Sequence, residues 1–472
     1  MFSIERTIQF IAPVVCLAVM VFTVSAFAEP EPNLADGTIT IGSIARSITY
    51  IYGQPQNDYR VDINHACFRD SRIRFYDDDQ TEPGISNHST AISSILIGFD
   101  PNASLAGVGT FTYQGVLPQA RLDVFEFWHF VTEYVFFQKT PNVDVITMSL
   151  GSAFDDWWSR GIEAMAQNFG LLIVAGIGNG AKAFDPPLYP AAAANVLGVG
   201  VVNSVTSPNN LIQFTLPDAN HSSTGPTDDD RCKPDIVAGG NYLAAVAAEP
   251  NLYELTGDYS SYAAPVVAGV AGILIQKAKS DPNLLAAISP AGGNCVLKSI
   301  LMTTATKLPG WHKGTAEEAD DNEYPLDFNQ GAGMLNAQAA LRLLTTIGQW
   351  DNNILQARGN SQNVYPITLN NQHSEVLTAT LVWNRFYENK YPFEPLPAED
   401  VDFRLELWAT DSNEPNESVL VDFSDSPVDN VEHIYFQLNN KFSDYELVVT
   451  TTEPAQSGNP SRYALSWQVV TQ

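Results

Sequence analysis

The sequence predicts an α/β fold with a mainly parallel sheet and helices on both of its faces, followed by an all-β sandwich. Residues 37–345 alternate between strand-like and helix-like runs. Several strand-like runs are continuously apolar, which is typical of parallel strands covered on both faces. After residue 345 the pattern changes to short alternating segments separated by turn residues at intervals of roughly 8–12, which indicates an antiparallel sandwich.

The individual elements are expected in the following order. Apolar runs predict the parallel strands, at residues 38–44, 123–127, 144–149, 171–175 and 196–202. Longer apolar or periodic runs predict helices at residues 89–97, 157–168, 262–279 and 295–304. Alternating segments predict sandwich strands at residues 375–383, 402–408, 418–423, 432–438, 445–451 and 462–469. We therefore predict one domain over residues 37–345 and a second over residues 355–472.

The balance of charge restricts the class of partner. The 472-residue chain carries 24 Lys and Arg against 53 Asp and Glu, a formal net charge of −29. A negative field of this size argues against nucleic acid and against anionic membrane surfaces as partners. With 45% hydrophobic residues, the chain can bury a sizeable core.

The first 28 residues have the pattern of an export signal. Arg6 precedes an apolar stretch over residues 10–24, and Ser25-Ala26-Phe27-Ala28 ends the segment with small residues. This pattern predicts a signal peptide over residues 1–28, cleaved after Ala28, and a secreted protein, either extracellular or periplasmic. The alternative is a membrane anchor. No later run of about 18 apolar residues occurs, so we expect no membrane span once the signal is removed.

Three cysteines remain in the expected mature chain: Cys67, Cys232 and Cys295. Their spacings match no zinc-binding pattern. Because an exported chain meets an oxidising compartment, we expect one disulfide and one free thiol, with the pairing left open.

Ser261 is a candidate nucleophile because it lies at the start of a helix that is apolar on all sides. Pro265 has no N–H, so the Ser261 carbonyl four residues earlier loses its helical partner. The positive end of the helix dipole also favours an ionised hydroxyl at this position. The alternative is an ordinary N-cap serine before a core helix.

His88 and Asn179 are further candidates. His88 opens a helix rich in small residues, and histidine is the side chain best suited to accept a proton from a serine near neutral pH. Asn179 follows a buried strand in the glycine-rich turn Gly176-Ile177-Gly178-Asn179-Gly180, where its amide can donate to a developing oxyanion. The alternatives are a capping or surface histidine and a turn asparagine.

Taken together, these segments resemble the subtilisin-like serine peptidases, the subtilases. His88-Ser89-Thr90 is similar to the family's His-Gly-Thr, Gly178-Asn179 to its oxyanion Gly-Asn, and Ser261-Tyr262-Ala263-Ala264-Pro265 to its Ser-Met-Ala-Ala-Pro. Residues 115–120, 146–151 and 222–237 resemble three further family segments. The resemblance implies a subtilisin-like sheet, Ser261 as nucleophile, His88 as base and Asn179 as oxyanion donor. It also implies a substrate-binding edge at Ser149, Leu150 and Gly151.

The resemblance further implies a triad aspartate, for which the sequence offers alternatives. Aligning residues 39–45 with the family's first strand places Ala45 where the acid belongs. Asp58 lies 30 residues before His88, a usual separation in the family, and its spacing to Asp62 and His65 echoes a family motif. Asp58 is the predicted acid, while Asp62 and a loss of the acid remain open.

Two further features bear on ligands and on the second domain. An acidic loop over residues 77–82 precedes His88, and clustered carboxylates can bind Ca²⁺, although a solvated acidic loop is the alternative. Serine-peptidase chemistry itself requires no cofactor. Residues 380–383, 402–407 and 430–434 resemble the jelly-roll-like sandwiches that follow some bacterial subtilases.

We therefore predict a secreted subtilisin-like serine endopeptidase that acts on protein or peptide substrates. The alternative is a catalytically impaired pseudopeptidase that serves as a peptide-binding or structural protein on the same scaffold. The sequence determines neither the cleavage preference nor the oligomeric state.

Overall fold

A computed structural model of the chain describes most of residues 38–471. The described residues are 38–47, 49–51, 54–56, 58–78, 84–180, 186–206, 212–215, 217, 221–288, 291–315, 321–355, 361–369, 375–397, 399–411, 417–439, 441–453 and 461–471. The predicted signal peptide lies outside them, so its cleavage and the export of the chain stay predictions.

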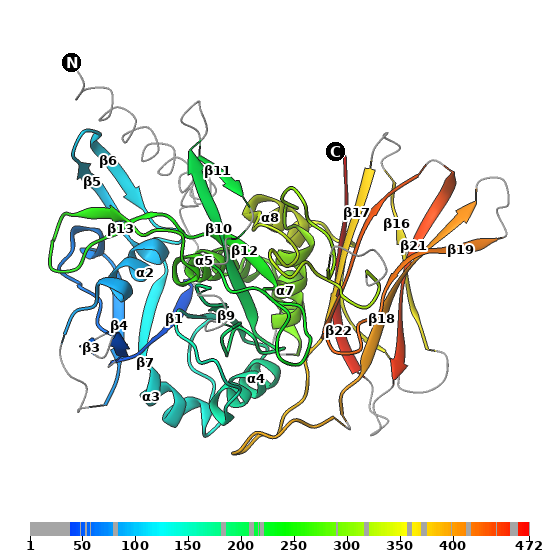
Figure 1. The fold of residues 1–472 in the computed structure, drawn as a ribbon, viewed down its shortest axis with the longest axis horizontal. Coiled ribbons are helices and arrows are strands. Elements are labelled where there is room, and N and C mark those ends of the chain that lie inside the picture. The colour runs from blue at the N-terminus through cyan, green and yellow to red at the C-terminus, as the bar shows by residue number, and fades with distance from the viewer. Residues whose placement is uncertain are drawn as a thin grey trace.

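The first part of the chain forms a mainly parallel sheet, as predicted (Figure 1). The strand order is β11-β10-β9-β8-β1-β7-β4, and β12 also pairs with β10. All pairings are parallel except that of β11 with β10. The strands are β1 (Thr40–Ala45), β4 (Arg72–Tyr76), β7 (Arg121–Glu126), β8 (Val145–Met148), β9 (Leu172–Gly176), β10 (Leu197–Thr206), β11 (Ile212–Thr215) and β12 (Ile236–Gly239).

Helices cover both faces of this sheet. The described helices are η1 (Ala66–Phe68), α2 (Asn87–Ile97), α3 (Phe127–Phe130), η2 (Val131–Val135), α4 (Trp157–Phe169), α5 (Ser260–Lys279), α6 (Pro282–Ala287), α7 (Gly293–Thr303) and α8 (Ala337–Thr345). Along β9, Leu172 and Val174 belong to one buried cluster together with residues of α5 and α7, whereas Ile173 and Ala175 belong to a second cluster together with residues of α3 and α4. Because successive side chains of a strand point to opposite faces, burial on both faces explains the continuous apolar runs.

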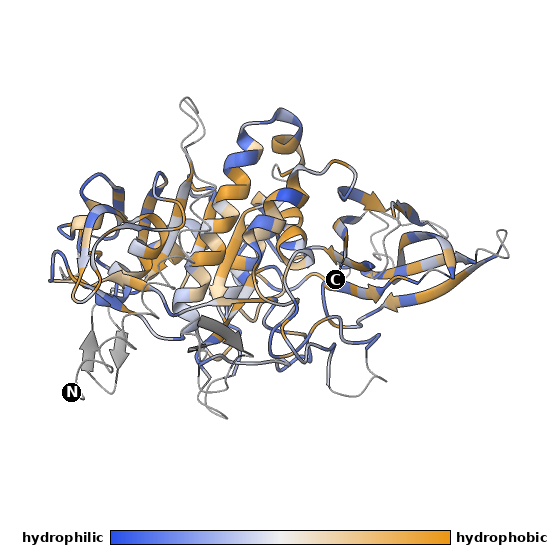
Figure 2. Ribbon diagram, turned by 90° about the horizontal axis from the view of Figure 1, so that it is seen from above, coloured by the Kyte–Doolittle hydropathy of each residue, from blue (hydrophilic) through white to orange (hydrophobic). Residues whose placement is uncertain are grey.

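Helix α5 is the longest of the described helices, with 20 residues, and Figure 2 shows hydrophobic residues gathered in the middle of the molecule. It is long and apolar enough to cross a membrane by length and composition, but 72% of its apolar window is buried inside the protein. This burial is what a core helix of a folded domain requires.

Short hairpins surround the sheet. They pair β2 (Thr49–Ile51) with β3 (Gln54–Gln56), β5 (Phe99–Leu105) with β6 (Gly109–Gln114), and β13 (Leu243–Ala245) with β14 (Tyr253–Leu255).

The last part of the chain is all-β, as predicted, and forms two four-stranded antiparallel sheets. One has the order β15-β22-β17-β20 and the other β16-β21-β18-β19. The strands are β15 (Trp350–Leu355), β16 (Asn363–Ile367), β17 (Glu375–Val382), β18 (Asp402–Asp411), β19 (Ser418–Ser424), β20 (Val431–Gln437), β21 (Phe442–Glu453) and β22 (Ser461–Thr471). Helix α8 ends before β15 begins, while the predicted domain limits at residues 345 and 355 stay predictions.

The sandwich sheet that contains β17 is covered on both faces. Leu377 and Leu381 of β17 pack against the second sheet, where they meet Phe403 and Leu447. On the other face, Thr303 of α7 hydrogen-bonds Thr380 at 2.8 Å, and Figure 1 shows α7 between the central sheet and the sandwich. All eight residues of β17 are therefore buried.

The predicted disulfide is wrong. Cys67, Cys232 and Cys295 are all free and buried. They belong to different parts of the core, namely η1, the loop before β12, and α7. Burial raises the pKa of all three thiols, that of Cys295 to about 12, so each behaves as a small apolar side chain.

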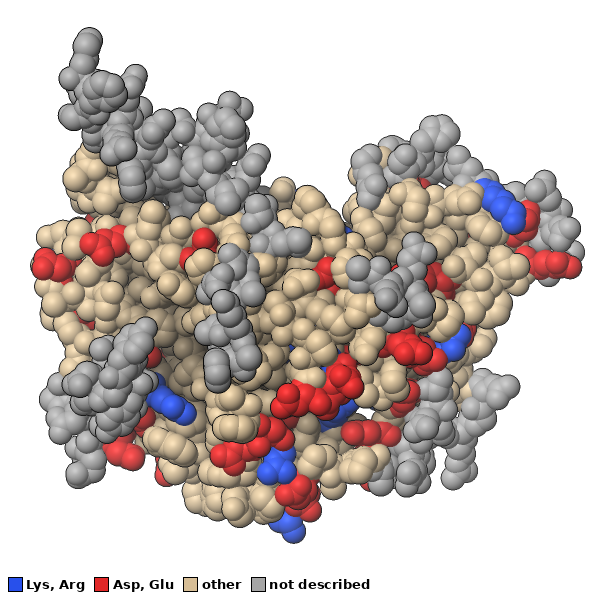
Figure 3. Space-filling view, in the orientation of Figure 1, with Lys and Arg blue, Asp and Glu red and all other residues tan. Residues whose placement is uncertain are grey.

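The surface is acidic, in line with the net charge of −29. Figure 3 shows Asp and Glu side chains spread over both parts of one face, with few Lys and Arg among them.

Candidate active site

His88 lies in the first turn of α2, where a serine fixes the start of the helix. The Ser86 side chain accepts a hydrogen bond from the Ser89 N–H at 3.0 Å, which satisfies one of the free donors of the first turn. His88 Nδ1 lies 3.0 Å from both carboxylate oxygens of Asp58. The two side chains are 27% and 20% exposed, so a substrate can reach the pair without crossing the core.

The structure explains why the sequence offered both Ala45 and Asp58 as the position of the acid. Strand β1 ends at Ala45, and the β2–β3 hairpin then intervenes before Asp58. The Asp58 N–H donates to the Arg46 carbonyl at 3.1 Å, which returns the chain to the end of β1. Ala45 and Asp58 therefore lie at the same end of the same strand, on either side of an inserted hairpin.

Two serines that the sequence analysis did not single out hold Asp58. Ser86 Oγ donates to Asp58 Oδ1 at 2.9 Å, and Ser89 Oγ donates to the Asp58 carbonyl at 2.6 Å. Ser89 occupies the position where the family motif has glycine, so this departure from the motif was the available signal.

Asp62 is engaged elsewhere. Its side chain is buried and accepts hydrogen bonds from the N–H of Ala248 at 2.8 Å and of Asn64 at 3.1 Å. The carboxylate thus ties its own loop to the segment after β13. Of the two candidate acids, only Asp58 contacts His88.

Ser261 lies in the first turn of α5, close to His88. The rings of His88 and Tyr262 meet edge to face with centroids 5.5 Å apart, and burial raises the pKa of Tyr262 to about 12. Among the residues that the structure describes, no hydrogen bond joins His88 to Ser261. Such bonds are often long in substrate-free enzymes and tighten when substrate binds.

The Ser261 carbonyl, which has no helical partner because Pro265 lacks an N–H, accepts a hydrogen bond from another residue. Ser149 Oγ donates to the Ser261 carbonyl at 2.7 Å. One predicted substrate-binding residue therefore also fixes the backbone of the predicted nucleophile.

Asn179 follows β9 and faces the start of α5. Its Oδ1 accepts a hydrogen bond from the Ser260 N–H at 2.9 Å and lies 3.0 Å from Ser260 Oγ. Ser260 Oγ in turn accepts from the Gly178 N–H at 3.2 Å. These contacts fix the plane of the Asn179 amide beside Ser261. The sequence analysis did not identify Ser260 as the residue that orients it.

Ser149, Leu150 and Gly151 leave the end of β8 as an extended edge. In the described part of the chain, these three residues make no backbone–backbone hydrogen bond, whereas the next residue, Ser152, pairs with Tyr189. A Cβ on Gly151 would lie 2.7 Å from Leu188 Cβ, so only glycine fits there. The edge has free backbone groups with which an extended peptide can pair.

Only Asp77 and Asp78 of the acidic loop lie among the described residues, so the calcium prediction for this loop stays a prediction. Asp77 forms an ion pair with Arg60, and Asp78 Oδ1 lies 3.0 Å from His129 Nδ1. Residues 79–83 lie outside the described residues. In the part that the structure describes, no group of three His, Cys, Asp or Glu residues could hold a metal ion.

Comparison with known proteins identifies the family. The model of the subtilase family, peptidase family S8, matches residues 37–333, and the chain therefore belongs to the subtilase family. It is 25% identical over 256 residues to serine protease AprX of Bacillus subtilis (strain 168), covering 48% of this chain and 55% of AprX. It is 27% identical over 246 residues to thermitase of Thermoactinomyces vulgaris, covering 51% of this chain and 76% of thermitase.

The patellamide maturation protease PatA is similar to 65% of this chain and 96% of its own, with 22% identity and a TM-score of 0.43. The matched region spans just over half the length of AprX. The subtilase family is a family of serine peptidases.

Proposed function

We propose that this chain is a secreted serine endopeptidase in which Ser261 attacks the scissile peptide carbonyl. His88 takes the Ser261 proton and then delivers it to the leaving amine, and water hydrolyses the acyl-enzyme by the same steps. The observation that carries the proposal is the 3.0 Å contact of Asp58 with His88 Nδ1. A proton on Nδ1 that is directed to this carboxylate leaves Nε2 as the base and stabilises the imidazolium.

The oxyanion is stabilised by two donors in the proposed mechanism. The Asn179 side-chain amide and the Ser261 N–H donate to the oxygen of the tetrahedral intermediate. The Ser260 contacts to Asn179 support this role because they hold the amide before substrate arrives. A protein or peptide substrate lies extended along Ser149, Leu150 and Gly151 and adds a strand through main-chain hydrogen bonds.

One observation favours a second candidate function, a peptide-binding pseudopeptidase. His88 and Ser261 share no hydrogen bond in the described structure, and a serine that is not activated reacts slowly. The same edge at residues 149–151 would then bind peptides without cleaving them.

Labelling with a fluorophosphonate probe separates the two functions. The peptidase predicts that purified protein is labelled at Ser261, that Ser261→Ala abolishes labelling, and that His88→Ala slows it strongly. Labelling of wild type that is no faster than that of His88→Ala would favour the pseudopeptidase. The N-terminus of protein recovered from medium or periplasm tests secretion, for which we expect Glu29.

A further inference from the structure

Residues 188–195, here called the wall segment, begin beside the substrate-binding edge. Tyr189 and Ser152 exchange two backbone hydrogen bonds of 2.8 Å, directly after the edge at residues 149–151. The Leu188 N–H donates to the Ile177 carbonyl at 2.8 Å, two residues before Asn179. The start of the wall segment thus flanks both the edge and the turn that carries the predicted oxyanion donor.

The middle of the wall segment is a compact turn. The Ala192 N–H donates to the Leu188 carbonyl at 2.8 Å, and the Ala193 N–H donates to the Pro190 carbonyl at 3.0 Å. Arg231, whose side chain is buried, donates through Nη1 to the Ala192 carbonyl at 2.8 Å. Because these hydrogen bonds hold the wall segment in one conformation, a displacement of residue 195 also displaces residue 188.

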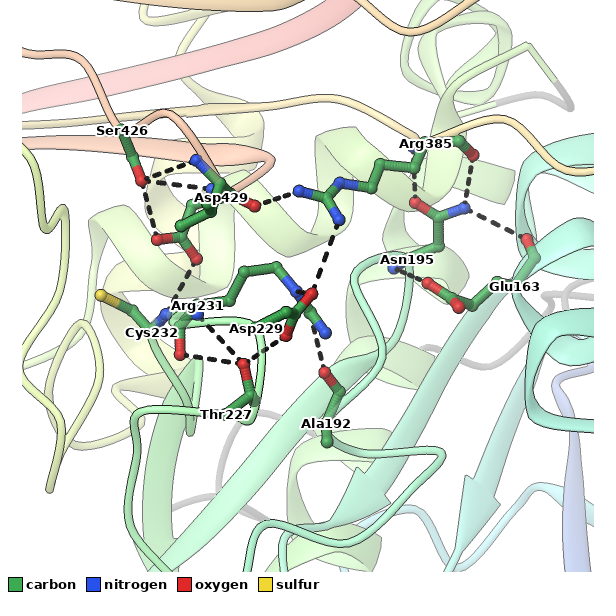
Figure 4. A network of polar contacts seen from close by, with 11 residues as sticks. Glu163, Ala192, Asn195, Thr227, Asp229, Arg231, Cys232, Arg385, Ser426 and Asp429 are labelled. Atoms are coloured by element: carbon green, nitrogen blue, oxygen red, sulfur yellow. Dashed lines mark hydrogen bonds and ion pairs between the residues drawn. The ribbon is translucent and has the colours of Figure 1, made fainter. Parts of the chain in front are cut away.

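The far end of the wall segment is held by the C-terminal part of the chain (Figure 4). Asn195 Oδ1 accepts from the Arg385 N–H at 2.8 Å, and Asn195 Nδ2 donates to the Arg385 carbonyl at 2.8 Å. Asn195 is 3% exposed, and its own N–H donates to Glu163 Oε1 at 3.2 Å. Its side chain therefore pairs with the backbone beyond β17 as a neighbouring strand would.

A second set of contacts holds the same junction. Asp229 accepts from Arg231 Nε at 2.8 Å, and Arg385 Nη1 lies 3.9 Å from the same carboxylate. Asp429, from the loop before β20, accepts from the Cys232 N–H at 3.0 Å. Figure 4 shows these groups as one continuous network across the junction.

We infer that the C-terminal sandwich positions the substrate-binding side of the active site, and that Asn195 is the positioning residue through which it acts. The inference rests on the proposed peptidase function. Ser261, His88 and Asp58 are held by contacts of their own, so loosening the wall segment impairs the binding of an extended peptide more than the chemical step. If the edge at residues 149–151 is displaced, an extended peptide binds more weakly, and this loss precedes cleavage of the peptide bond.

The test compares two alanine variants that remove similar bonds from the same junction. Asn195→Ala removes both hydrogen bonds to Arg385 and a longer third one, of 3.3 Å, from Asn195 Nδ2 to the Glu163 carbonyl. Asn294→Ala removes the two amide bonds, of 2.8 and 3.2 Å, that join Asn294 of α7 to Asn384, the residue next to Arg385. Both asparagines are 3% exposed, but Asn294 makes no contact of this kind with the wall segment.

We expect Asn195→Ala to raise KM for a peptide substrate about tenfold with kcat changed about threefold or less, a change of the size that losing a buried hydrogen bond produces. We expect both variants to lower the thermal midpoint, because each loses buried hydrogen bonds. Asn294→Ala should nevertheless leave KM within about twofold of wild type. Equal KM changes in the two variants, or an unchanged KM in Asn195→Ala, would overturn the inference.

Hydrogen exchange followed by mass spectrometry tests the positioning without requiring activity. Amides of residues 188–193 should exchange faster in Asn195→Ala and remain as protected as wild type in Asn294→Ala. If Asn195→Ala does not fold, Asn195→Asp keeps the acceptor for the Arg385 N–H and should show the same exchange pattern. Unchanged protection at residues 188–193 in a folded Asn195 variant refutes the positioning role, whereas wild-type protein that lacks activity refutes only the proposed function.

Discussion

Replacing Asp58 by asparagine tests whether Asp58 is the triad acid, since the change removes the negative charge and preserves the shape of the side chain. The carboxylate faces His88 Nδ1 through both oxygens at 3.0 Å. Unit charges about 4 Å apart attract by about 4 kcal/mol at an effective dielectric constant of about 20, which is about 10³ in rate. Because an amide also permits the wrong imidazole tautomer, we expect a kcat loss of about 10³ to 10⁴.

The assay is peptide hydrolysis at neutral pH by protein whose folding has been checked by circular dichroism. Asp62→Asn is the matched control, since Asp62 accepts two backbone N–H groups and does not contact His88. We expect Asp62→Asn to retain kcat within about tenfold and to lose about 1 kcal/mol of stability through a weakened hydrogen bond. The reasoning would be refuted by a folded Asp58→Asn protein that keeps a tenth or more of wild-type kcat, or by equal losses in the two variants.

Three further predictions concern other parts of the molecule. Ser149→Ala leaves the Ser261 carbonyl without its 2.7 Å donor, so we expect a stability loss of about 1–2 kcal/mol in thermal denaturation; an unchanged midpoint would contradict this. Asn179→Ala should lower kcat about 10²- to 10³-fold with KM nearly unchanged, because an oxyanion donor acts mainly in the transition state; a selective rise in KM would contradict it. Burial raises the pKa of Asp429 to about 6, above its unfolded value of about 3.9. The folded state therefore binds this proton more tightly than the unfolded state does. The resulting stabilisation is fully present below about pH 4 and is lost as pH rises through about 6. Asp429→Asn should therefore raise the thermal midpoint at about pH 8 and change it little below about pH 4, and the opposite pH trend would disprove the burial argument.

The sequence by itself determined the class of fold and the parts of the candidate site that are local. Continuous apolar runs such as the one in β9 predicted burial on both faces, because a strand has only two faces and each needs a partner layer. Pro265 predicted that the Ser261 carbonyl would lack a helical partner, because proline has no N–H to give. Such features follow from a few neighbouring residues, whose chemistry is the same wherever the segment lies.

Only the tertiary structure decided which groups meet across the chain. The donor for the Ser261 carbonyl, Ser149, is 112 residues away, and Asn195 finds the Arg385 backbone 190 residues away. The three cysteines do not pair, although composition and the expected compartment favoured a disulfide. Asp58 could be distinguished from Asp62 only once the inserted hairpin had returned the chain to Arg46. The physical reason is that contacts between residues far apart in the sequence depend on how whole helices and strands pack. The residues next to either contact residue in the sequence do not determine that packing.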